Sequence, residues 1–344
     1  MKHAGTLTIK TERLTLRRLD FSDAEMMFQN WANDDEVTRY LRFQSHKDVD
    51  ESRAIIQQWV ESYKEENMYL WGICLKDGEM IGTVGIMVTA EFDFKAETGY
   101  CIGRNWWGNG YVSEALKAVI DYMFTNTDIE RIEAYHAVEN PASGKVMANA
   151  GMSFEGFARH KFKNSYGFYD SDMYGIIRES WEVQNEIVYY NALPCVFNDF
   201  IDVPELSDGV ISLDCIEKNP AIPEKKWVPG YAFDICKDGE AIGGINLRIG
   251  YTTSLYYGGQ IGYDIDEGHR GNGYAGSACR LLLPIAKAHG MEKLLITNHQ
   301  PNTSSKRVCE KLGARLVRVA RLPEWHDLYK EGQRYQNIYE WDVE

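Results

Sequence analysis

Two stretches of the sequence decide the fold: CIGRNWWGNGYVSEALKAVI at residues 101–120 and YDIDEGHRGNGYAGSACRLLL at residues 263–283. Each is typical of a strand end, a loop that contains Gly-Asn-Gly, and the first turns of a helix. Glycines allow backbone N–H groups to approach a ligand closely, and the helix N-terminus adds partial positive charge. Each stretch therefore predicts an anion site suited to a phosphate or pyrophosphate.

The rest of the chain repeats at nearly the same spacing. The turn KDGEMIG at 76–82 returns as KDGEAIG at 237–243, and ETGYCIG at 97–103 aligns with QIGYDID at 260–266. The offset stays between 161 and 165 residues along the chain. Three later positions keep it: Asn140, Ser143 and Gly151 align with Asn302, Ser305 and Gly313. Such self-similarity indicates two copies of one domain.

A chain of 344 residues is long enough for about two domains. We predict an N-terminal domain at 1–181, a linker at 182–194 and a C-terminal domain at 195–344. Each half mixes antiparallel hairpins with helices around the central strand, loop and helix. This order predicts an α/β (α+β layered) fold with two tandem domains, each a mixed, mostly antiparallel sheet flanked by helices.

The bulk composition excludes several classes of partner. The net charge of −14 argues against nucleic acid, because phosphate backbones require a basic face; it is compatible with a cationic substrate such as an amine, although it mostly serves solubility. No apolar run approaches the ~20 residues of a membrane helix, and the N-terminus lacks the apolar core of a secretory signal. The seven cysteines form no Cys-x-x-Cys pair, which favours free thiols in a reducing cytoplasm and no metal.

A second motif competes with this interpretation. Gly271, Gly273 and Gly276 form a literal Gly-x-Gly-x-x-Gly, the pattern of a dinucleotide-binding fold. That fingerprint needs a strand that runs directly into the first glycine. Here DEGHR at 266–270 intervenes, and the first copy has Ser113 where the third glycine would fall. We therefore reject a dinucleotide site.

The motifs resemble those of the GNAT superfamily of N-acetyltransferases, whose signature is Gln/Arg-x-x-Gly-x-Gly/Ala. The chain has NWWGNG at 105–110 and GHRGNG at 268–273; both keep the two glycines and both lack the leading Gln or Arg. The first half also resembles the branch that acetylates the N-termini of ribosomal proteins, through TERLTLRRL at 11–19 and ENPASGKVMANAGM at 139–152.

The resemblance implies that acetyl-CoA binds between two splayed parallel strands, the fourth and the fifth, with its pyrophosphate on the Gly-rich loop. The fourth strands are then 97–103 and 260–266, the fifth 131–138 and 293–298, and the loops 107–112 and 270–275. The cofactor-binding residues implied in the first half are Cys101, Ile102, Gly103, Trp107, Gly108, Asn109, Gly110, Tyr111, Val112 and Asn140. Those implied in the second half are Asp264, Ile265, Asp266, Arg270, Gly271, Asn272, Gly273, Tyr274, Ala275 and Asn302.

The chemistry needs a neutral amine, so an ammonium must lose a proton before it attacks. Glu97 lies at the start of the fourth strand, where the resemblance places a base. Its counterpart is Gln260, which is no proton acceptor, so we expect the first half to be the better-equipped catalyst. The alternative is that Glu97 is an ordinary exposed residue at a strand end.

The leaving thiolate also needs stabilisation. Many relatives use a Tyr four residues before the glycine that ends the short helix, but here Met147 and Cys309 stand in its place. The resemblance suggests Ser143 and Ser305 as substitutes; the alternative is that each serine only caps its helix. Two histidines beside the fifth strands, His136 and His299, are weaker candidates for proton transfer.

The sequence thus predicts a cytoplasmic tandem N-acetyltransferase that transfers an acetyl group from acetyl-CoA to a small-molecule or peptide amine by direct attack, without metal, nucleic acid or membrane. Two alternatives stay open. One half could be catalytic and the other a CoA-binding or structural half, or the whole chain could be a non-catalytic sensor of acyl-CoA or another small ligand. The repeat is compatible with a monomer that contains an internal pseudo-dimer, or with a homodimer.

Overall fold

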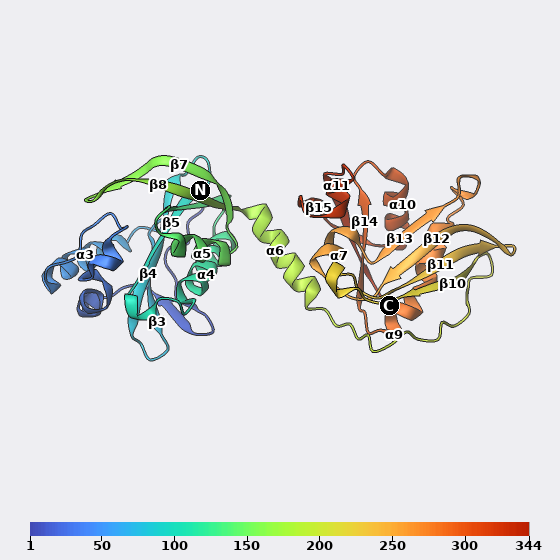
Figure 1. Ribbon diagram of the computed structural model, residues 1–344, viewed down its shortest axis with the longest axis horizontal. Helices are drawn as coiled ribbons and strands as arrows, with labels where there is room; N and C mark the ends of the chain where they lie inside the picture. The colour runs from blue at the N-terminus through green and yellow to red at the C-terminus, as the bar shows by residue number, and fades with distance from the viewer. Residues whose placement is uncertain (344) are drawn as a thin grey trace. The chain divides into compact units, whose positions relative to one another are not determined.

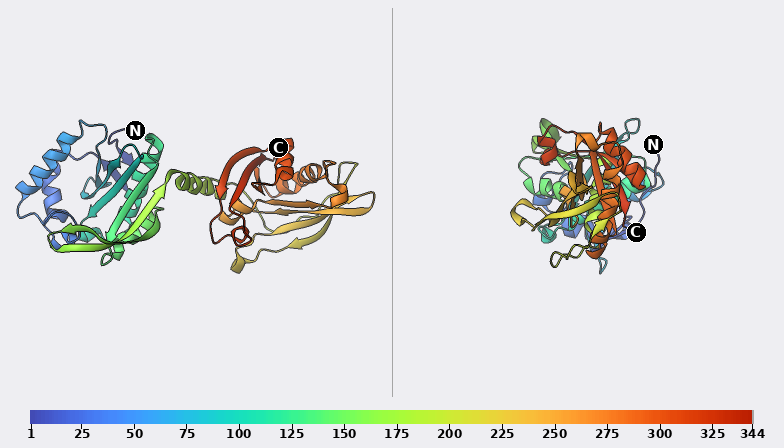
Figure 2. Two further views of the ribbon diagram at one scale, coloured as in Figure 1. Left: turned by 90° about the horizontal axis from the view of Figure 1, so that it is seen from above. Right: turned by 90° about the vertical axis from the view of Figure 1, so that its right-hand side faces the viewer.

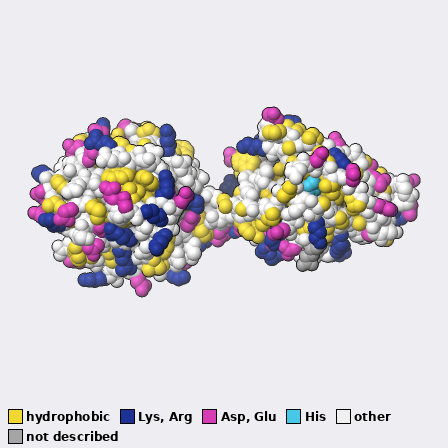
Figure 3. All heavy atoms as spheres, turned by 90° about the horizontal axis from the view of Figure 1, so that it is seen from below, with side chains coloured by type: hydrophobic (Ala, Val, Ile, Leu, Met, Phe, Trp, Pro, Cys, Tyr) yellow, Lys and Arg dark blue, Asp and Glu magenta, His cyan; other side chains and the backbone are white. Residues whose placement is uncertain are grey.

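The computed structural model describes residues 1–343, which form two compact units. We call Met1–Glu182 the first unit and Val183–Glu344 the second unit. Figures 1 and 2 show that each unit is built on a twisted sheet with helices packed against it. On the face shown in Figure 3, acidic and basic side chains are interspersed over both units.

The sheet of the first unit has eight strands in the order β1-β2-β3-β4-β5-β6-β8-β7. Its strands are β1 (Ile9–Lys10), β2 (Leu14–Arg17), β3 (Tyr69–Leu75), β4 (Met80–Ala90), β5 (Lys95–Ile102), β6 (Arg131–Ala137), β7 (Ser153–Asn164) and β8 (Gly167–Ile177). All neighbours are antiparallel except β5 and β6. Those two pair in parallel only up to Glu97 and Glu133, although β5 continues to Ile102. The two strands therefore separate toward their carboxyl ends.

Helices cover both faces of this sheet. They are α1 (Ala24–Met27), α2 (Asp35–Thr38), α3 (Val49–Ser62), α4 (Tyr111–Asn126) and α5 (Pro141–Asn149), with short helical turns at Phe21–Asp23, Phe28–Ala32 and Arg104–Trp106. Helix α4 buries Leu116, Val119 and Ile120 against Trp71 and Val84 of the sheet. That apolar stripe fixes the position of the helix, and with it the Gly-rich loop at its start.

The second unit repeats this plan in an eight-stranded sheet ordered β15-β16-β14-β13-β12-β11-β10-β9. Its strands are β9 (Leu206–Ser207), β10 (Ser212–Asn219), β11 (Gly230–Lys237), β12 (Glu240–Arg248), β13 (Ile261–Ile265), β14 (Lys293–His299), β15 (Arg315–Arg321) and β16 (Tyr335–Asp342). The one parallel pair is β13 with β14, recorded only between Ile261 and Ile296. The predicted fold class is confirmed for both halves.

The helices of the second unit are α7 (Thr253–Gly258), α8 (Tyr274–Leu281), α9 (Leu283–Ala288), α10 (Thr303–Leu312) and α11 (Asp327–Lys330), with short turns at Pro223–Lys225 and Glu267–His269. Pro284 has no N–H to donate, and the helix after the loop is divided into α8 and α9 just before it. In the first unit, α4 runs unbroken through the equivalent length.

Helix α6 (Arg178–Asn191) covers most of the segment we predicted as a linker. At its start, the guanidinium of Arg178 donates hydrogen bonds to backbone carbonyls of the first unit, including Phe124 O at 2.6 Å. Near its end, Tyr190 Oη donates to Glu340 of the second unit at 2.8 Å. The division between the units falls inside this helix, and 182–194 stays our proposed linker.

Two structural searches bear on the class of protein. Within residues 1–343, no helix combines the length and apolar character needed to span a bilayer. The same residues contain no group of three or more His, Cys, Asp or Glu side chains arranged to hold a metal ion.

Candidate acetyl-CoA site and acceptor pocket

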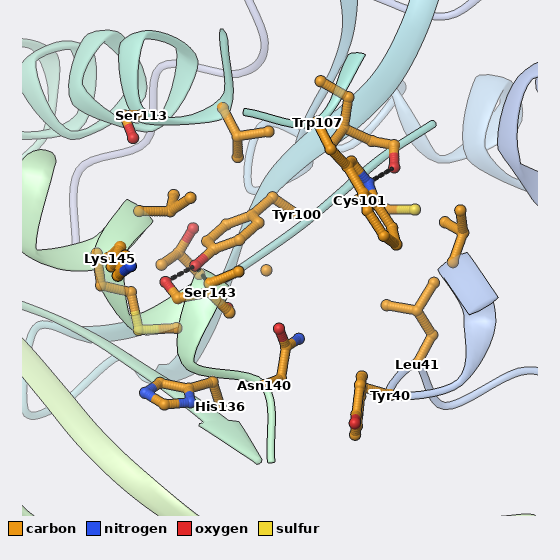
Figure 4. A pocket seen from close by; sticks show the side chains of 18 of the residues that line it. Tyr40, Leu41, Tyr100, Cys101, Trp107, Ser113, His136, Asn140, Ser143 and Lys145 are labelled. Carbon is orange, nitrogen blue, oxygen red and sulfur yellow. Dashed lines mark hydrogen bonds between the residues drawn. The ribbon is translucent and has the colours of Figure 1, made fainter. Parts of the chain in front are cut away.

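A pocket of about 730 Å³ lies in the first unit where β5 and β6 separate. It is lined by residues of β5, the Gly-rich loop, the start of α4, β6, α5 and the segment after α2 (Figure 4). Its volume is in the range of small-molecule sites in proteins. The parallel pairing that stops at Glu97 is therefore the feature that opens the pocket.

The Gly-rich loop is held by its own side chains. Gly108 and Gly110 have φ of +78° and +76°, backbone angles that residues with a Cβ rarely adopt. Trp107 Nε1 donates to Ile102 O at 3.0 Å (Figure 4), and Asn109 Nδ2 donates to Trp107 O at 3.2 Å. Helix α4 begins immediately after Gly110, so its first N–H groups face outward at the end of the pocket without intrahelical partners.

The loop of the second unit has the same construction. Gly271 and Gly273 have φ of +83° and +86°. Asn272 Nδ2 donates to His269 O at 3.0 Å, and Arg270 Nε donates to Ile265 O at 2.8 Å. Arg270 thus donates to the backbone carbonyl at the end of β13, as Trp107 donates to the carbonyl at the end of β5. That shared role could not be predicted from the sequence, because the two side chains have little in common except an N–H donor.

The structure gathers most of the predicted first-half residues around one pocket. Eight of its ten predicted cofactor-binding residues line it: Cys101, Ile102, Trp107, Gly108, Gly110, Tyr111, Val112 and Asn140. Asn109 lies in the loop, where its side chain braces the backbone. Gly103 packs beneath the loop, where an added Cβ would lie 2.3 Å from Asn30 O. The ten second-half residues occupy the equivalent strand, loop and helix start.

Glu97 lines the pocket from β5 and is partly buried. Burial raises the pKa of its carboxyl above the ordinary value, while the nearby cations of Lys161 and Arg42 act in the opposite direction. A carboxyl with a raised pKa is a stronger base once it has lost its proton. The alternative of an ordinary exposed strand-end residue does not describe its surroundings.

Gln260 has a different task in the second unit. Its side chain is fully buried. Oε1 accepts a hydrogen bond from Leu295 N at 2.6 Å, and Nε2 donates to Gly250 O at 3.1 Å. Because both ends of the amide are engaged, Gln260 fastens the start of β13 to β14.

Ser143 is paired with a tyrosine that the sequence interpretation missed. Tyr100 Oη lies 2.8 Å from Ser143 Oγ and donates to Ser143 O at 2.8 Å (Figure 4). The second unit repeats the pair, with Tyr263 Oη 2.9 Å from Ser305 Oγ. Burial raises the pKa of both tyrosines well above the ordinary range. The signal was the Gly-Tyr shared by ETGYCIG and QIGYDID.

Neither serine occupies the capping position of its helix, which is Asn140 for α5 and Asn302 for α10. Asn302 Oδ1 accepts from Ser305 N at 3.1 Å. The Asn140 side chain makes no such bond and lies in the pocket (Figure 4). The capping alternative for the serines is therefore wrong, and the Asn140 amide is directed at the space that a ligand would fill.

His136 of the first unit corresponds to Asn298 of the second. Its Nδ1 lies 2.8 Å from Ala137 O, and its Nε2 lies 3.9 Å from Asp172 Oδ2. Strand register pairs His136 with Asp172, and the matching pair in the second unit is Asn298 with Asn337. Asn337 Nδ2 donates to Asn298 Oδ1 at 2.8 Å. His299, the other candidate for proton transfer, is exposed at the end of β14.

Comparison with known proteins agrees with this geometry. The model of the acetyltransferase (GNAT) domain family matches residues 13–153 and 212–315. An uncharacterized N-acetyltransferase, p20 of Bacillus licheniformis, is 35% identical over 175 residues, covering 51% of this chain and 98% of that protein. The [ribosomal protein uS5]-alanine N-acetyltransferase of Escherichia coli is 30% identical over 156 residues, covering 44% of this chain and 80% of that protein.

A solved structure, the ribosomal-protein-S5-alanine acetyltransferase of Vibrio fischeri, aligns with a TM-score of 0.46 and 23% identity over 51% of this chain and 98% of its own. The family assignment depends on the sequence comparisons. The two matched regions fall one in each unit. The chain belongs to the GNAT family of acetyltransferases, with two domains of that family in tandem.

Proposed function

We propose that the first unit transfers an acetyl group from acetyl-CoA to a primary amine. The observation that carries this proposal is the single pocket that joins the Gly-rich loop to Glu97 along β5. One end offers the start of α4 and glycines that leave room for a phosphate. The other end offers a base. Both are required for direct transfer, and both lie on one strand and the loop that follows it.

Residues already in the pocket fit acetyl-CoA. The N–H groups after Gly110 would bind the pyrophosphate, and the Asn140 amide would hold the pantetheine arm. The thioester would then lie along β5 between Glu97 and Tyr100. Glu97 accepts a proton from the ammonium of the acceptor, directly or through water, and the amine nitrogen forms a bond to the acetyl carbon as the carbon–sulfur bond breaks. The nitrogen then gives up its second proton, which ends on the departing sulfur, so that the products are the amide and the CoA thiol.

The hydroxyl pair Tyr100–Ser143 would stabilise the departing thiolate. When the Tyr100 proton is directed at Ser143 Oγ, the serine proton can turn into the pocket, because hydroxyl protons rotate to suit their partners. The raised pKa of Tyr100 disfavours its ionisation. We therefore assign the pair a hydrogen-bonding role: it supports negative charge on sulfur without giving up a proton.

We propose that the second unit is a non-catalytic half, which binds CoA or serves the structure. It retains the loop and the Tyr263–Ser305 pair. The position of Glu97 is held by a buried amide, Gln260, and the position of the His136–Asp172 pair by two asparagines. No side chain at these positions can accept a proton from an ammonium.

The test measures release of CoA from acetyl-CoA in the presence of a peptide with an N-terminal alanine. That peptide is chosen because the related Escherichia coli protein is named for alanine acetylation. Binding of acetyl-CoA is measured in parallel by calorimetry. Acetylated peptide supports the proposal. Binding without turnover on any amine would support the sensor alternative, and no binding would overturn the acetyltransferase proposal.

A further inference from the structure

The acceptor end of the pocket is closed by two segments that are far apart in the sequence. One is the stretch after α2, which contributes Tyr40, Leu41 and Arg42 to the lining, and the other is the β7–β8 hairpin, which contributes Phe162. Asn164 Nδ2 joins them by donating to Leu41 O at 3.2 Å. A base in the pocket, Glu97, lies next to this closure.

Two cations converge on one tyrosine of this wall. Arg42 Nη2 lies 2.5 Å from Tyr135 Oη, and Lys161 Nζ lies 5.0 Å from the centroid of the Tyr135 ring. Both cations are close enough to Glu97 to affect its charge. In the described part of the chain, neither forms an ion pair with a carboxylate within 4.0 Å.

More basic side chains stand on the same two segments. Arg39 lies over the Tyr40 ring with its guanidinium carbon 5.5 Å from the centroid, and Lys163 lies over the Phe168 ring at 5.3 Å. Aromatic faces support these cations without neutralising them. These side chains add positive charge to the two segments, in a chain whose net charge is −14.

Three other arginines of the first unit form ion pairs with carboxylates. Arg17 is paired with Asp23 at 2.7 Å, Arg104 with Asp34 at 2.6 Å, and Arg13 with Glu114 at 2.6 Å. Arg42 and Lys161 therefore differ from these three arginines in having an aromatic partner in place of a carboxylate. Of the carboxylates in the described chain, only Glu97 lines the pocket, and the proposed mechanism assigns it to the amine.

We propose that the acceptor carries an anionic group, a carboxylate or a phosphate, close to the amine that is acetylated, and that Arg42 and Lys161 bind this group. The inference rests on the proposed function of the first unit. The net charge of the chain is compatible with a cationic substrate, whereas these two side chains favour an acceptor that also carries an anion. A polyamine would meet like charge at the mouth, which disfavours binding.

The same cations also act on Glu97. They oppose the burial that raises the pKa of its carboxyl, and so favour the ionised form, which is the form that can accept a proton from the amine.

The test uses four peptides that differ only at the second residue: Ala-Glu-Gly-amide, Ala-phosphoserine-Gly-amide, Ala-Gln-Gly-amide and Ala-Lys-Gly-amide. Calorimetry measures their binding to the full chain saturated with CoA, so that no acetyl group is transferred. We expect one of the anionic peptides to bind about tenfold more tightly than the Gln peptide, and the Lys peptide to bind most weakly. The better anion identifies carboxylate or phosphate as the source.

The variant R42Q/K161Q should bring the anionic peptides to the level of the Gln peptide. The variant K10Q/K117Q removes two exposed cations outside the pocket lining and should keep the preference. The preference should also shrink as the salt concentration rises from about 0.05 M to about 0.5 M, because the screening length of charge interactions falls to less than half over this range.

Equal binding of all four peptides, tightest binding of the Lys peptide, or no measurable binding would overturn the inference. Retention of the anion preference in R42Q/K161Q would also overturn the assignment of these two residues. Failure of the proposed function has a separate signature: acetyl-CoA would not bind, or no peptide would be acetylated even though the anion preference was intact.

Discussion

The two units share a fold and a loop but differ at the positions that handle protons. Glu97 in the first unit corresponds to Gln260 in the second, and the His136–Asp172 pair corresponds to Asn298 and Asn337. At each position an ionisable group is matched by an amide. The amides of the second unit are engaged in hydrogen bonds, Gln260 with Leu295 N and Gly250 O and Asn337 with Asn298 Oδ1, and they have no capacity to accept a proton from an ammonium.

The features common to both units are the ones that position a ligand. Glycines at positive φ begin α4 and α8, an asparagine precedes α5 and α10, and a tyrosine of β5 or β13 meets a serine. The residues that would position CoA are thus common to both units, whereas the residues that would act on the amine are present only in the first.

Glu97→Gln gives the first unit the amide that the second unit has, as Gln260, at the position of the general base. We expect kcat to fall by about a hundredfold, because removal of a general base typically costs that much or more. In the unaltered chain, kcat/KM should decrease as the pH falls through the raised pKa of Glu97, since the protonated carboxyl cannot accept a proton. Steady-state rates across pH check both effects. Near-normal turnover at saturating amine would refute the assignment.

Gln260→Glu makes the reverse exchange, and we expect it to fail as a gain of function. The side chain is fully buried with both ends hydrogen-bonded, so a carboxylate there would lose the bond to Gly250 O and bury a charge. The free energy of unfolding of the second unit should decrease by about 3 kcal/mol, measured by denaturant titration. Unchanged stability of the second unit would contradict this prediction. Turnover in the double variant Glu97→Gln/Gln260→Glu would show that the second unit can catalyse once it has a carboxylate.

Tyr100→Phe removes the hydroxyl that holds Ser143. We expect kcat to fall by about tenfold with the KM for acetyl-CoA unchanged, because the lost hydrogen bond supports charge that develops on sulfur. Tyr263→Phe is the matched control and should leave turnover unaltered. A fall in kcat that is accompanied by an equal loss of thermal stability would assign Tyr100 to structure alone.

Trp107→Arg gives the first loop the side chain of the second. Both side chains donate to the carbonyl at the strand end, at 3.0 Å for Trp107 and 2.8 Å for Arg270. We therefore expect the KM for acetyl-CoA to change by no more than about twofold, as for most exposed substitutions. A large rise in KM would mean that the indole contacts the cofactor, and that the loops are not interchangeable.

Parts of this account could be predicted from the sequence, because they depend on local pattern. The Gly-Asn-Gly loops, the division of the helix before Pro284 and the position of Glu97 all follow from residues that are close together in the chain. The repeat strengthened the prediction of the loops, whereas Glu97 and Pro284 have no residue of the same type at the equivalent position of the other half. The ends of the strands and the resemblance to the family could be recognised because they too depend on local pattern.

Other parts depend on which strands become neighbours. Tyr100 meets Ser143 across 43 positions, and Asn164 reaches the carbonyl of Leu41 across 123. No spacing rule connects such residues. The true counterpart of His136 became visible only through the register of β6 with β8. The cations at the acceptor mouth were hidden in the same way, because Arg42 and Lys161 meet only when the hairpin folds over the pocket.

The most direct test of the central claim compares Gly110→Asp with Gly273→Asp. Each glycine precedes its helix at positive φ, aspartate is accepted at helix starts and tolerates that conformation better than most residues, and its charge would repel a pyrophosphate. Turnover of acetyl-CoA is measured for both variants with the N-terminal alanine peptide. We predict that Gly110→Asp loses turnover and Gly273→Asp retains it; loss in Gly273→Asp, or retention in Gly110→Asp, would contradict the account.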